Sequence, residues 1–191
     1  MKTNLDHFGF VAPYYDRIFN DHNIERLTNL FHLHDGALVL DAGGGTGRIS
    51  QGFQRGICRV VTADQSFKMV RIAKEKEGLL PICTSTETLA FAGNLFNAII
   101  IVDALHHVED AAQTAAELWR VLKPGGRLVI EEPNIDHFGV KLLALAEKLA
   151  LMRSHFIAPQ KMVALFAPFL AECQVKKDGA ITWIIVDKPL A

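Results

Sequence analysis

The feature that most constrains this chain is a glycine-rich stretch at residues 39–50, Val-Leu-Asp-Ala-Gly-Gly-Gly-Thr-Gly-Arg-Ile-Ser. Its four glycines lie between an apolar run typical of a buried strand and a segment that we expect to be helical. Glycine permits a turn with positive φ and lets a ligand approach a bare backbone. We therefore interpret this stretch as a ligand-binding loop that joins a strand to a helix.

Strand-like and helix-like segments alternate through the first two thirds of the chain, which is typical of repeated strand–helix–strand units and a parallel sheet. A helix is expected at about 111–122, ended by the Lys-Pro-Gly-Gly run at 123–126, because proline cannot continue a helix and glycine accepts a left-handed cap. The strands are expected at 37–41, 59–64, 79–84, 96–103 and 127–132.

The two ends of the chain follow other patterns. A segment around 15–31 should be helical and lie before the first strand, as a lid or a flank. Two helical stretches are expected at about 138–152 and 159–167. Two strand-like runs joined at 176–179 then predict an antiparallel hairpin added to the sheet.

The spacing of the glycines decides which ligand the loop fits. A dinucleotide fingerprint, G-x-G-x-x-G, would need a sixth-position glycine, but Arg48 stands there counting from Gly43 and Ser50 counting from Gly45. A nucleoside-triphosphate loop would need Gly-Lys followed by Ser or Thr, and Gly47 is followed by Arg-Ile. Neither phosphate-binding pattern fits.

The spacing that does fit is Asp-x-Gly-x-Gly-x-Gly at Asp41, Gly43, Gly45 and Gly47. It resembles the nucleotide-side motif of the class I S-adenosylmethionine-dependent methyltransferases, whose donor carries an amino-acid tail and no phosphate. The resemblance implies that the loop backbone packs against the amino acid and ribose of the donor. It also implies that Asp41 helps to orient the donor's ammonium group.

A second acid, Asp64, closes the next expected strand, so it should lie at the same edge of the sheet as the loop. A carboxylate there can accept hydrogen bonds from both ribose hydroxyls, each worth about 1.5 to 3 kcal/mol. NAD enzymes also use an acid at this place. The glycine spacing therefore carries the discrimination, and an NAD-dependent oxidoreductase stays an alternative.

The resemblance extends over about residues 8–132. Residues 84–91 look like the adenine segment of the family, with Ser85 where an Asp is usual, so a weaker hydroxyl would meet the adenine amino group. Residues 96–108 and 117–126 resemble the fourth-strand motif and the turn before the fifth strand. Residues 10–16, Phe-Val-Ala-Pro-Tyr-Tyr-Asp, look like the segment that covers the donor in the ubiquinone/menaquinone-methyltransferase-like group (type 11).

This resemblance implies a fold, a domain plan and a donor site. The fold is Rossmann-like α/β, a doubly wound, mostly parallel seven-stranded sheet with helices on both faces and a C-terminal antiparallel hairpin. We expect one domain over 1–191, with a helical lid at about 8–35, a donor-binding core at about 36–132, and acceptor-side helices and the hairpin at about 133–191. The donor-binding residues would be Tyr15, Asp41, Gly43, Gly45, Gly47, Asp64, Gln65, Met69, Ser85, Thr86, Glu87 and Asp103.

Two histidines, His106 and His107, come just after the fourth expected strand, where donor and acceptor would meet. A neutral imidazole there could take the proton from a phenol or an enol. Paired histidines in a turn are also often packing groups, so both interpretations stay open. Because alignment of the two reactants alone can supply about 7 to 11 kcal/mol, the reaction does not need a strong general base.

The charge balance and the cysteine content limit which partners and which cellular setting we expect. Lys and Arg total 20 against 21 Asp and Glu, with no basic stripe, so we expect no nucleic-acid partner. Cys58, Cys83 and Cys173 are isolated and show no metal-ligand spacing, which predicts a reducing cytoplasmic setting and no metal. No run is long enough for a transmembrane helix, although the apolar stretch 140–152 could wall a lipophilic pocket, touch a membrane surface or cover the sheet.

The sequence thus predicts an S-adenosylmethionine-dependent methyltransferase that acts on a small molecule and releases S-adenosylhomocysteine. The resemblance makes a carbon or oxygen on a quinone-like ring one candidate acceptor. A donor-binding regulatory module without catalysis is the second hypothesis, and the NAD-dependent oxidoreductase is the third. The oligomeric state is not indicated by these residues.

Overall fold

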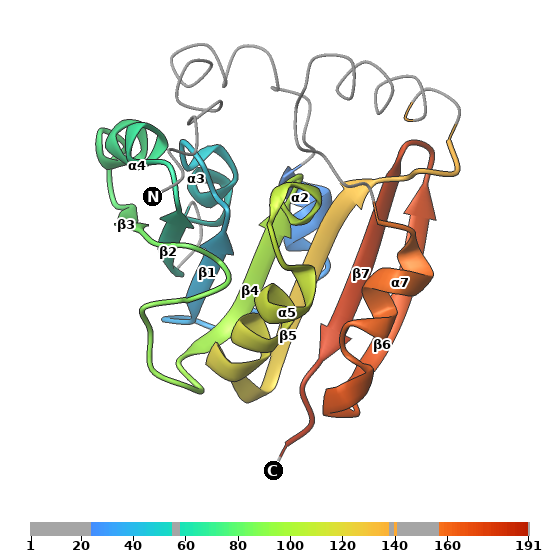
Figure 1. The fold of residues 1–191 in the computed structure, drawn as a ribbon. Helices are drawn as coiled ribbons and strands as arrows, with labels where there is room; N and C mark the ends of the chain where they lie inside the picture. Colours follow the sequence, from blue (N-terminus) through green and yellow to red (C-terminus); the bar gives the residue numbers. More distant parts are fainter. Residues whose placement is uncertain (1–23, 55–57, 138–139, 141–156, 191) are drawn as a thin grey trace.

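The computed structural model describes residues 24–54, 58–137, 140 and 157–190 of the 191-residue chain (Figure 1). The strands are β1 (Leu38–Ala42), β2 (Arg59–Asp64), β3 (Leu80–Cys83), β4 (Phe96–Val102), β5 (Leu122–Pro133), β6 (Glu172–Asp178) and β7 (Ile181–Asp187). The helices are α2 (Ile24–Thr28), α3 (Arg48–Gln54), α4 (Phe67–Lys74), α5 (Ala111–Val121) and α7 (Pro159–Ala164), with 3₁₀ turns η1 (Leu105–His107) and η2 (Ala167–Phe169).

The strands form a seven-stranded sheet in the order β3-β2-β1-β4-β5-β7-β6 (Figure 1). Strands β1 to β5 run parallel, and β7 is antiparallel to both β5 and β6. The strand order reverses between β1 and β4, and in such sheets ligands bind where the loops after the two strands diverge. The predicted fold class is confirmed, and the glycine loop follows one of these two strands.

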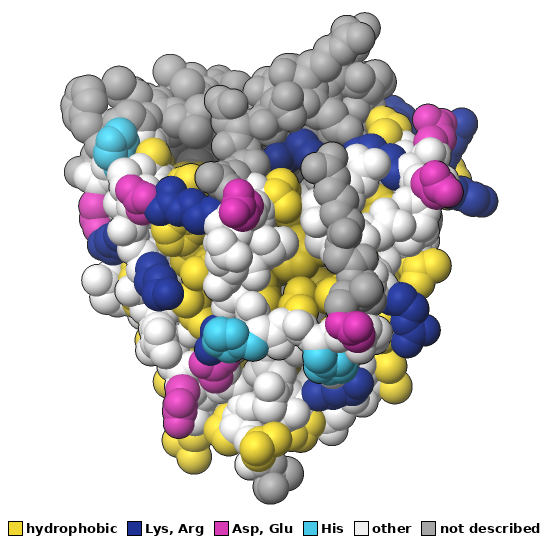
Figure 2. Space-filling view, turned by 180° about the vertical axis from the view of Figure 1, so that it is seen from behind, with side chains coloured by type: hydrophobic (Ala, Val, Ile, Leu, Met, Phe, Trp, Pro, Cys, Tyr) yellow, Lys and Arg dark blue, Asp and Glu magenta, His cyan; other side chains and the backbone are white. Residues whose placement is uncertain are grey.

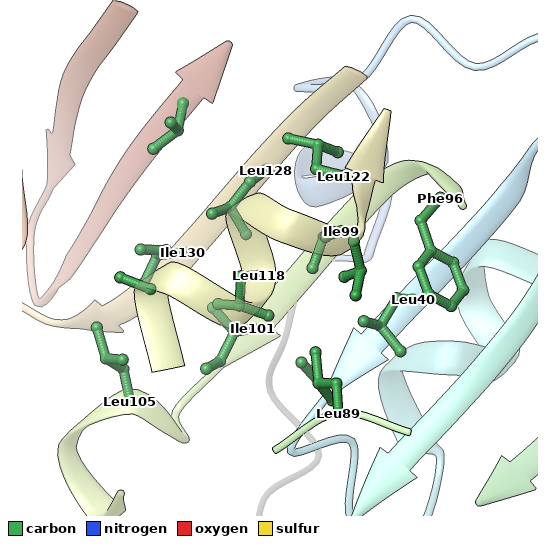
Figure 3. Packing of buried hydrophobic residues seen from close by; sticks show 14 of the residues in the cluster. Leu40, Leu89, Phe96, Ile99, Ile101, Leu105, Leu118, Leu122, Leu128 and Ile130 are labelled. Atoms are coloured by element: carbon green, nitrogen blue, oxygen red, sulfur yellow. The ribbon is translucent and has the colours of Figure 1, made fainter. Parts of the chain in front are cut away.

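Helices cover both faces of the sheet, as predicted. Successive strand residues point to opposite faces, so the buried strands feed two separate apolar clusters. In the first cluster, Leu40 and Ile99 pack with Leu118 of α5 (Figure 3). In the second, Val39, the neighbour of Leu40, packs in a cluster with Leu27 of α2. The core therefore holds β1 and β4, and with them the loops that follow these strands, in fixed positions.

The end of α5 differs from the prediction. The helix ends at Val121, and Leu122 already has extended backbone angles and pairs with Phe96 as the first residue of β5. The run 123–126 therefore belongs to the strand and does not cap the helix. Gly125, with φ of +74°, lies where the register between β4 and β5 shifts. A glycine at position 125 allows the positive φ at this irregularity in the pairing of β4 with β5. The prediction of a left-handed helix cap was wrong.

The C-terminal hairpin is present with a slightly different turn. The residues joining β6 to β7 are Gly179 and Ala180, because Asp178 and Ile181 already pair with each other. The helix expected at 159–167 is α7 followed by η2. The helix expected at 138–152 lies outside the described residues except for Val140, and of the one expected at 15–31 only α2 is described.

Acidic and basic side chains are interspersed on the face shown in Figure 2, which lies opposite the face seen in Figure 1. This mixing agrees with the near-zero formal charge of −1. Within the described part of the chain, no helix has the length and apolar character needed to cross a membrane.

Candidate functional site

The glycine loop is a tight turn tied to the end of β2. The N–H groups of Gly43 and Gly44 both donate to the carbonyl oxygen of Ala63, at 2.8 and 3.0 Å. Gly43, Gly45 and Gly47 have φ of +71°, +56° and +76°. Residues with side chains rarely adopt such angles, so the three glycines of the motif meet a backbone requirement, as the sequence predicted.

Two of these glycines also lie so close to neighbouring residues that a side chain would not fit without a shift. A Cβ atom at Gly43 would lie 2.6 Å from Cβ of Ala104, which follows β4. At Gly47 it would lie 2.5 Å from Cδ1 of Leu79. The loop after β1 and the loop after β4 are therefore in direct contact at the switch point. The sequence predicted ligand contact through the backbone of Gly43, Gly45 and Gly47, and the structure adds that a side chain at Gly43 or Gly47 would meet neighbouring protein atoms.

Gly45 differs, because a Cβ there would make only ordinary van der Waals contacts. Its nearest neighbours would be Sδ of Met69 at 3.9 Å and Oδ2 of Asp64 at 4.0 Å. The Gly45 N–H donates to Oδ2 of Asp64 at 2.9 Å, and the Ser66 N–H donates to Oδ1 at 2.7 Å. These bonds fix the carboxylate, and an oxygen that accepts one N–H has a second lone pair for a hydroxyl. The bare backbone at Gly45, Met69 and Asp64 therefore form one cradle.

Asp41 lies beneath the loop and is 1% exposed. Its Oδ2 accepts from the Ser50 hydroxyl at 2.6 Å, and that hydroxyl lies 2.7 Å from Oγ1 of Thr62. Burial raises the pKa of Asp41 to about 6, although the Ser50 hydrogen bond and the charge of Arg48 oppose the shift. The carboxylate is therefore mostly ionised near neutral pH, held at a cost in solvation.

A small cavity of about 20 Å³ opens beside this carboxylate. Asp41, the loop residues 43–45, Arg48 and Val102 line it. Nε of Arg48 is buried and has no hydrogen-bond partner among the described residues. The site thus presents a carboxylate and a guanidinium on the lining of one cavity, and a zwitterionic group could pair with both.

The segment after β3 is organised around Glu87. The Ser85 hydroxyl donates to Oε2 of Glu87, and the Glu109 N–H donates to Oε1 at 2.9 Å. Burial raises the pKa of Glu87, but these and further backbone hydrogen bonds outweigh it, so the pKa lies below the ordinary value. Glu87 therefore ties this segment to the start of α5. Thr86, also predicted in the donor site, is buried with Oγ1 3.4 Å from Oγ1 of Thr114.

The remaining predicted donor residues have different surroundings. Asp103 has a φ of +50° directly after β4, and its N–H donates to the carbonyl oxygen of Glu131 at 2.9 Å. Positive φ at a residue other than glycine is uncommon and concentrates at functional sites. Gln65 is exposed next to Asp64. Tyr15 lies outside the described residues.

The two histidines form η1 with Leu105, and their ring centroids lie 3.9 Å apart. His106 is 4% exposed, and its Nδ1 is hydrogen-bonded to Oε2 of Glu132, which is also 4% exposed. Burial, reinforced by the charge of His106, lowers the pKa of His107 to about 3. Sequence reasoning missed Glu132, although the signal that singled out Asp64, an acid closing a buried strand, was present.

Comparison with known proteins agrees with this geometry. Residues 40–130 match the family model described as "Methyltransferase domain". A demethylmenaquinone methyltransferase of Thermobifida fusca is 40% identical over 105 residues, 52% of this chain and 44% of that protein. The ubiquinone/menaquinone biosynthesis C-methyltransferase UbiE of Hydrogenovibrio crunogenus is 34% identical over 143 residues, 65% of this chain and 56% of that protein. The chain spans about half the length of these relatives.

A solved structure shows the same fold at low sequence identity. A protein of Thermotoga maritima, described as an S-adenosylmethionine-dependent methyltransferase and possible histamine N-methyltransferase, superposes with a TM-score of 0.78 and 20% identity. The superposition covers 95% of this chain and 97% of that one.

Fold, glycine loop and family match together define a class I methyltransferase domain of the S-adenosylmethionine-dependent type. Within this class the chain resembles proteins of the UbiE-like group, which it matches at 34 to 40% identity over about half of their length. The class and the cofactor predicted from the glycine spacing are thereby confirmed.

Proposed function

We propose that this protein transfers a methyl group from S-adenosylmethionine to a small-molecule acceptor with a quinone-like ring. One observation carries the proposal: two carboxylates, Asp41 and Asp64, flank the glycine loop, and the charge of Asp64 adds to the burial that raises the pKa of Asp41. A pyrophosphate would add negative charge next to them, whereas a sulfonium and an ammonium group would neutralise them. The loop therefore favours a cationic, phosphate-free nucleoside.

The residues that would hold the donor follow from the cradle. Asp64, fixed by two backbone N–H groups, would accept the ribose hydroxyls, and Met69 would pack against the nucleoside. Asp41 would face the ammonium group and Arg48 the carboxylate of the amino-acid tail. S-adenosylmethionine, when bound, supplies a methyl group on a positively charged sulfur. The protein's own contribution is to align the acceptor with it.

The acceptor is inferred from the relatives. One is named a demethylmenaquinone methyltransferase and the other a C-methyltransferase of ubiquinone/menaquinone biosynthesis, and residues 40–130 of this chain, which match the methyltransferase family model, include the loops after β1 and β4. Three free cysteines support a reducing, cytoplasmic setting. The near-zero formal charge of −1 supports an acceptor other than nucleic acid.

The test incubates the purified full chain with methyl-labelled S-adenosylmethionine and 2-prenyl-1,4-naphthohydroquinone, and follows label in the product by mass spectrometry. We expect a singly methylated product from the wild type and much less from Asp64→Asn. No transfer to this or any extracted metabolite, with the donor still bound, would contradict the proposal.

That last outcome would instead support a donor-binding module without catalysis. One observation favours this second candidate: the Ser85 hydroxyl, expected to meet adenine, is already bonded to Glu87. Quenching of reduced nicotinamide fluorescence by the protein would support the oxidoreductase.

A further inference from the structure

A buried polar cluster lies behind the loop after β4, on the face of the sheet that α5 covers. It consists of His106 and Glu132, each 4% exposed, and Thr182, which is fully buried. We propose that Glu132 positions His106 as the proton acceptor of the reaction, and that the substrate is therefore one that loses a proton at the methylated atom or its conjugated hydroxyl. The inference rests on the proposed function and adds the chemical class of the acceptor.

Glu132 uses both of its oxygens on the same short turn. Oε1 accepts from the Leu105 N–H at 2.7 Å, and Oε2 is hydrogen-bonded to Nδ1 of His106. An ionised carboxylate only accepts hydrogen bonds, so Nδ1 carries the proton in this pair. In a neutral imidazole with Nδ1 protonated, Nε2 is the nitrogen that can take another proton. The hydrogen bonds of Glu132 thus fix both the orientation and the tautomer of the His106 imidazole.

The cluster interrupts an otherwise apolar face. Along the pairing of β5 with β7, Leu128 lies opposite Val186 and Ile130 opposite Ile184, and the next pair on this face is Glu132 with Thr182. Glu132 and its partner Thr182 lie at the C-terminal end of β5.

The polar pair is costly to bury. Burial raises the pKa of Glu132, and the Thr182 hydroxyl has no hydrogen-bond partner among the described residues. Each unpaired buried polar group costs about 1 to 3 kcal/mol, which packing alone does not require. The polar end of this face is therefore buried at a cost in stability.

The cluster is next to the donor loop. Ala104, one residue before η1, is the residue that a side chain at Gly43 would strike, at 2.6 Å. The turn that carries His106 therefore starts in contact with the loop that would hold the donor. His106 is therefore placed to take a proton from a substrate molecule that lies against both loops.

The step balances in atoms and charge. The acceptor's electron pair, released as its O–H or conjugated C–H system gives up a proton, forms the new bond to the methyl carbon. The electrons of the carbon–sulfur bond stay on sulfur as a neutral thioether, and the proton passes to Nε2 of His106. The positive charge lost at sulfur reappears as an imidazolium beside the Glu132 carboxylate, so the net charge of the site does not change.

His107 is not equivalent to His106. Its pKa is lowered to about 3 by burial and by the charge of His106, although Asp103 opposes this shift. With ring centroids 3.9 Å apart, the two imidazoles cannot readily both carry a positive charge. Glu132, His107 and Asp103 are the titratable neighbours that the structure gives to this cluster. The ring of His106 is hydrogen-bonded to the carboxylate of Glu132.

The experiment compares Glu132→Gln with Glu131→Gln. Glu131 is an equally buried carboxylate, 4% exposed, which accepts from Nε1 of Trp183 at 2.5 Å and belongs to the opposite face. With 2-prenyl-1,4-naphthohydroquinone, we expect Glu132→Gln to lower kcat about 100-fold with KM unchanged, because the amide cannot stabilise an imidazolium. The acid limb of its kcat/KM pH profile should move to lower pH. Glu131→Gln should keep the wild-type kcat and profile.

A second measurement does not depend on turnover. Nitrogen-15 NMR of the histidine-labelled full chain, saturated with S-adenosylhomocysteine, should show His106 protonated at Nδ1 and unprotonated at Nε2, and Glu132→Gln should change these populations. A His106→Asn variant assigns the signals. A kcat of Glu132→Gln near that of wild type, or a proton on Nε2 with Nδ1 bare, would overturn the inference.

The two proposals fail in different ways. If S-adenosylhomocysteine binds but the wild type does not methylate the naphthohydroquinone, the acceptor assignment is wrong, and the tautomer found by NMR decides whether Glu132 positions His106. If the wild type methylates the probe and Glu132→Gln does so equally well, the proposed function stands and the inference about the cluster is wrong.

Discussion

The loops after β1 and β4 meet at the switch point but obtain their shapes in different ways. The first is shaped by its backbone: three glycines with positive φ and two N–H groups bonded to Ala63. The second is held by side chains, because Glu132 binds both Leu105 and His106 from a neighbouring strand. The donor loop is therefore fixed by local sequence, and the acceptor loop by a residue 26 positions away.

This difference separates binding of a ligand that many enzymes share from the chemistry of one particular reaction. A backbone cradle recognises a ligand common to a whole class of enzymes, since it needs only glycines and an acid at the end of each strand. A side-chain clamp can be changed by one substitution without altering the fold. We expect substitutions in the first loop to change folding and donor affinity, and substitutions around the second to change the reaction.

The largest expected effect is on folding stability, from a substitution at Gly47. Gly47→Ala places a methyl 2.5 Å from Cδ1 of Leu79 at a φ of +76°. We expect a loss of about 2 to 4 kcal/mol in the free energy of unfolding, combining left-handed strain and overpacking. Gly179→Ala is the control, because its φ is +55° but nothing lies within 4 Å, so only the strain remains. Urea denaturation of both variants measures the difference; equal losses would mean that Leu79 yields freely.

Next in size is donor affinity at Asp64. Asp64→Asn removes the charge of the carboxylate that the Gly45 and Ser66 N–H groups orient. We expect S-adenosylhomocysteine to bind about 10- to 100-fold more weakly, as for the loss of a hydrogen bond to a charged group. The control is Asp110→Asn, since asparagine can still cap α5 as the aspartate does. Unchanged affinity by calorimetry would remove Asp64 from the donor site.

Asp41 should show a pH effect on stability. Its pKa in the folded state, about 6, lies above the ordinary 3.8, so the folded state binds this proton more tightly than the unfolded state. The stability it contributes is therefore complete below about pH 4 and lost as pH rises through about 6. We expect ligand-free Asp41→Asn to be about 2 kcal/mol more stable than wild type at pH 7.5, yet to bind the donor more weakly. Denaturation between pH 4 and 8 checks this; parallel curves for the two proteins would contradict it.

The smallest effect should be at Trp183, on the face away from the histidines. Trp183→Phe removes the indole N–H that donates to Glu131 at 2.5 Å and exchanges the indole, whose centroid lies 4.7 Å from the Arg26 guanidinium, for a phenyl ring. We expect a loss of about 1 to 2 kcal/mol in stability from the lost hydrogen bond, with unchanged donor affinity. Thermal unfolding and calorimetry on the same preparation measure both. A changed donor affinity would show that the two faces are coupled.

The geometry of the loop after β1 could be predicted because its signals are local. Spacing alone located Gly43, Gly45 and Gly47, and an acid at the end of a buried strand located Asp41 and Asp64. These features depend on neighbouring residues and on the parallel sheet, both of which leave a pattern in the sequence.

The loop after β4 was only partly predictable. His106 was singled out from its place after β4, and Glu132 closes an expected strand as Asp64 does. That the two side chains pair could not be foreseen until β5 was placed beside β4. Likewise the run 123–126 has the composition of a helix stop, yet pairing of Leu122 with Phe96 makes it part of a strand. Tertiary contacts decided both cases, and composition could not show them.

The most direct test of the donor loop is titration calorimetry of the full chain with S-adenosylhomocysteine and, separately, with NAD⁺. We expect saturable heat with S-adenosylhomocysteine that is weakened in Asp64→Asn, and none with NAD⁺. Binding of NAD⁺ together with no heat from S-adenosylhomocysteine would contradict a phosphate-free, cationic nucleoside as the ligand of this loop.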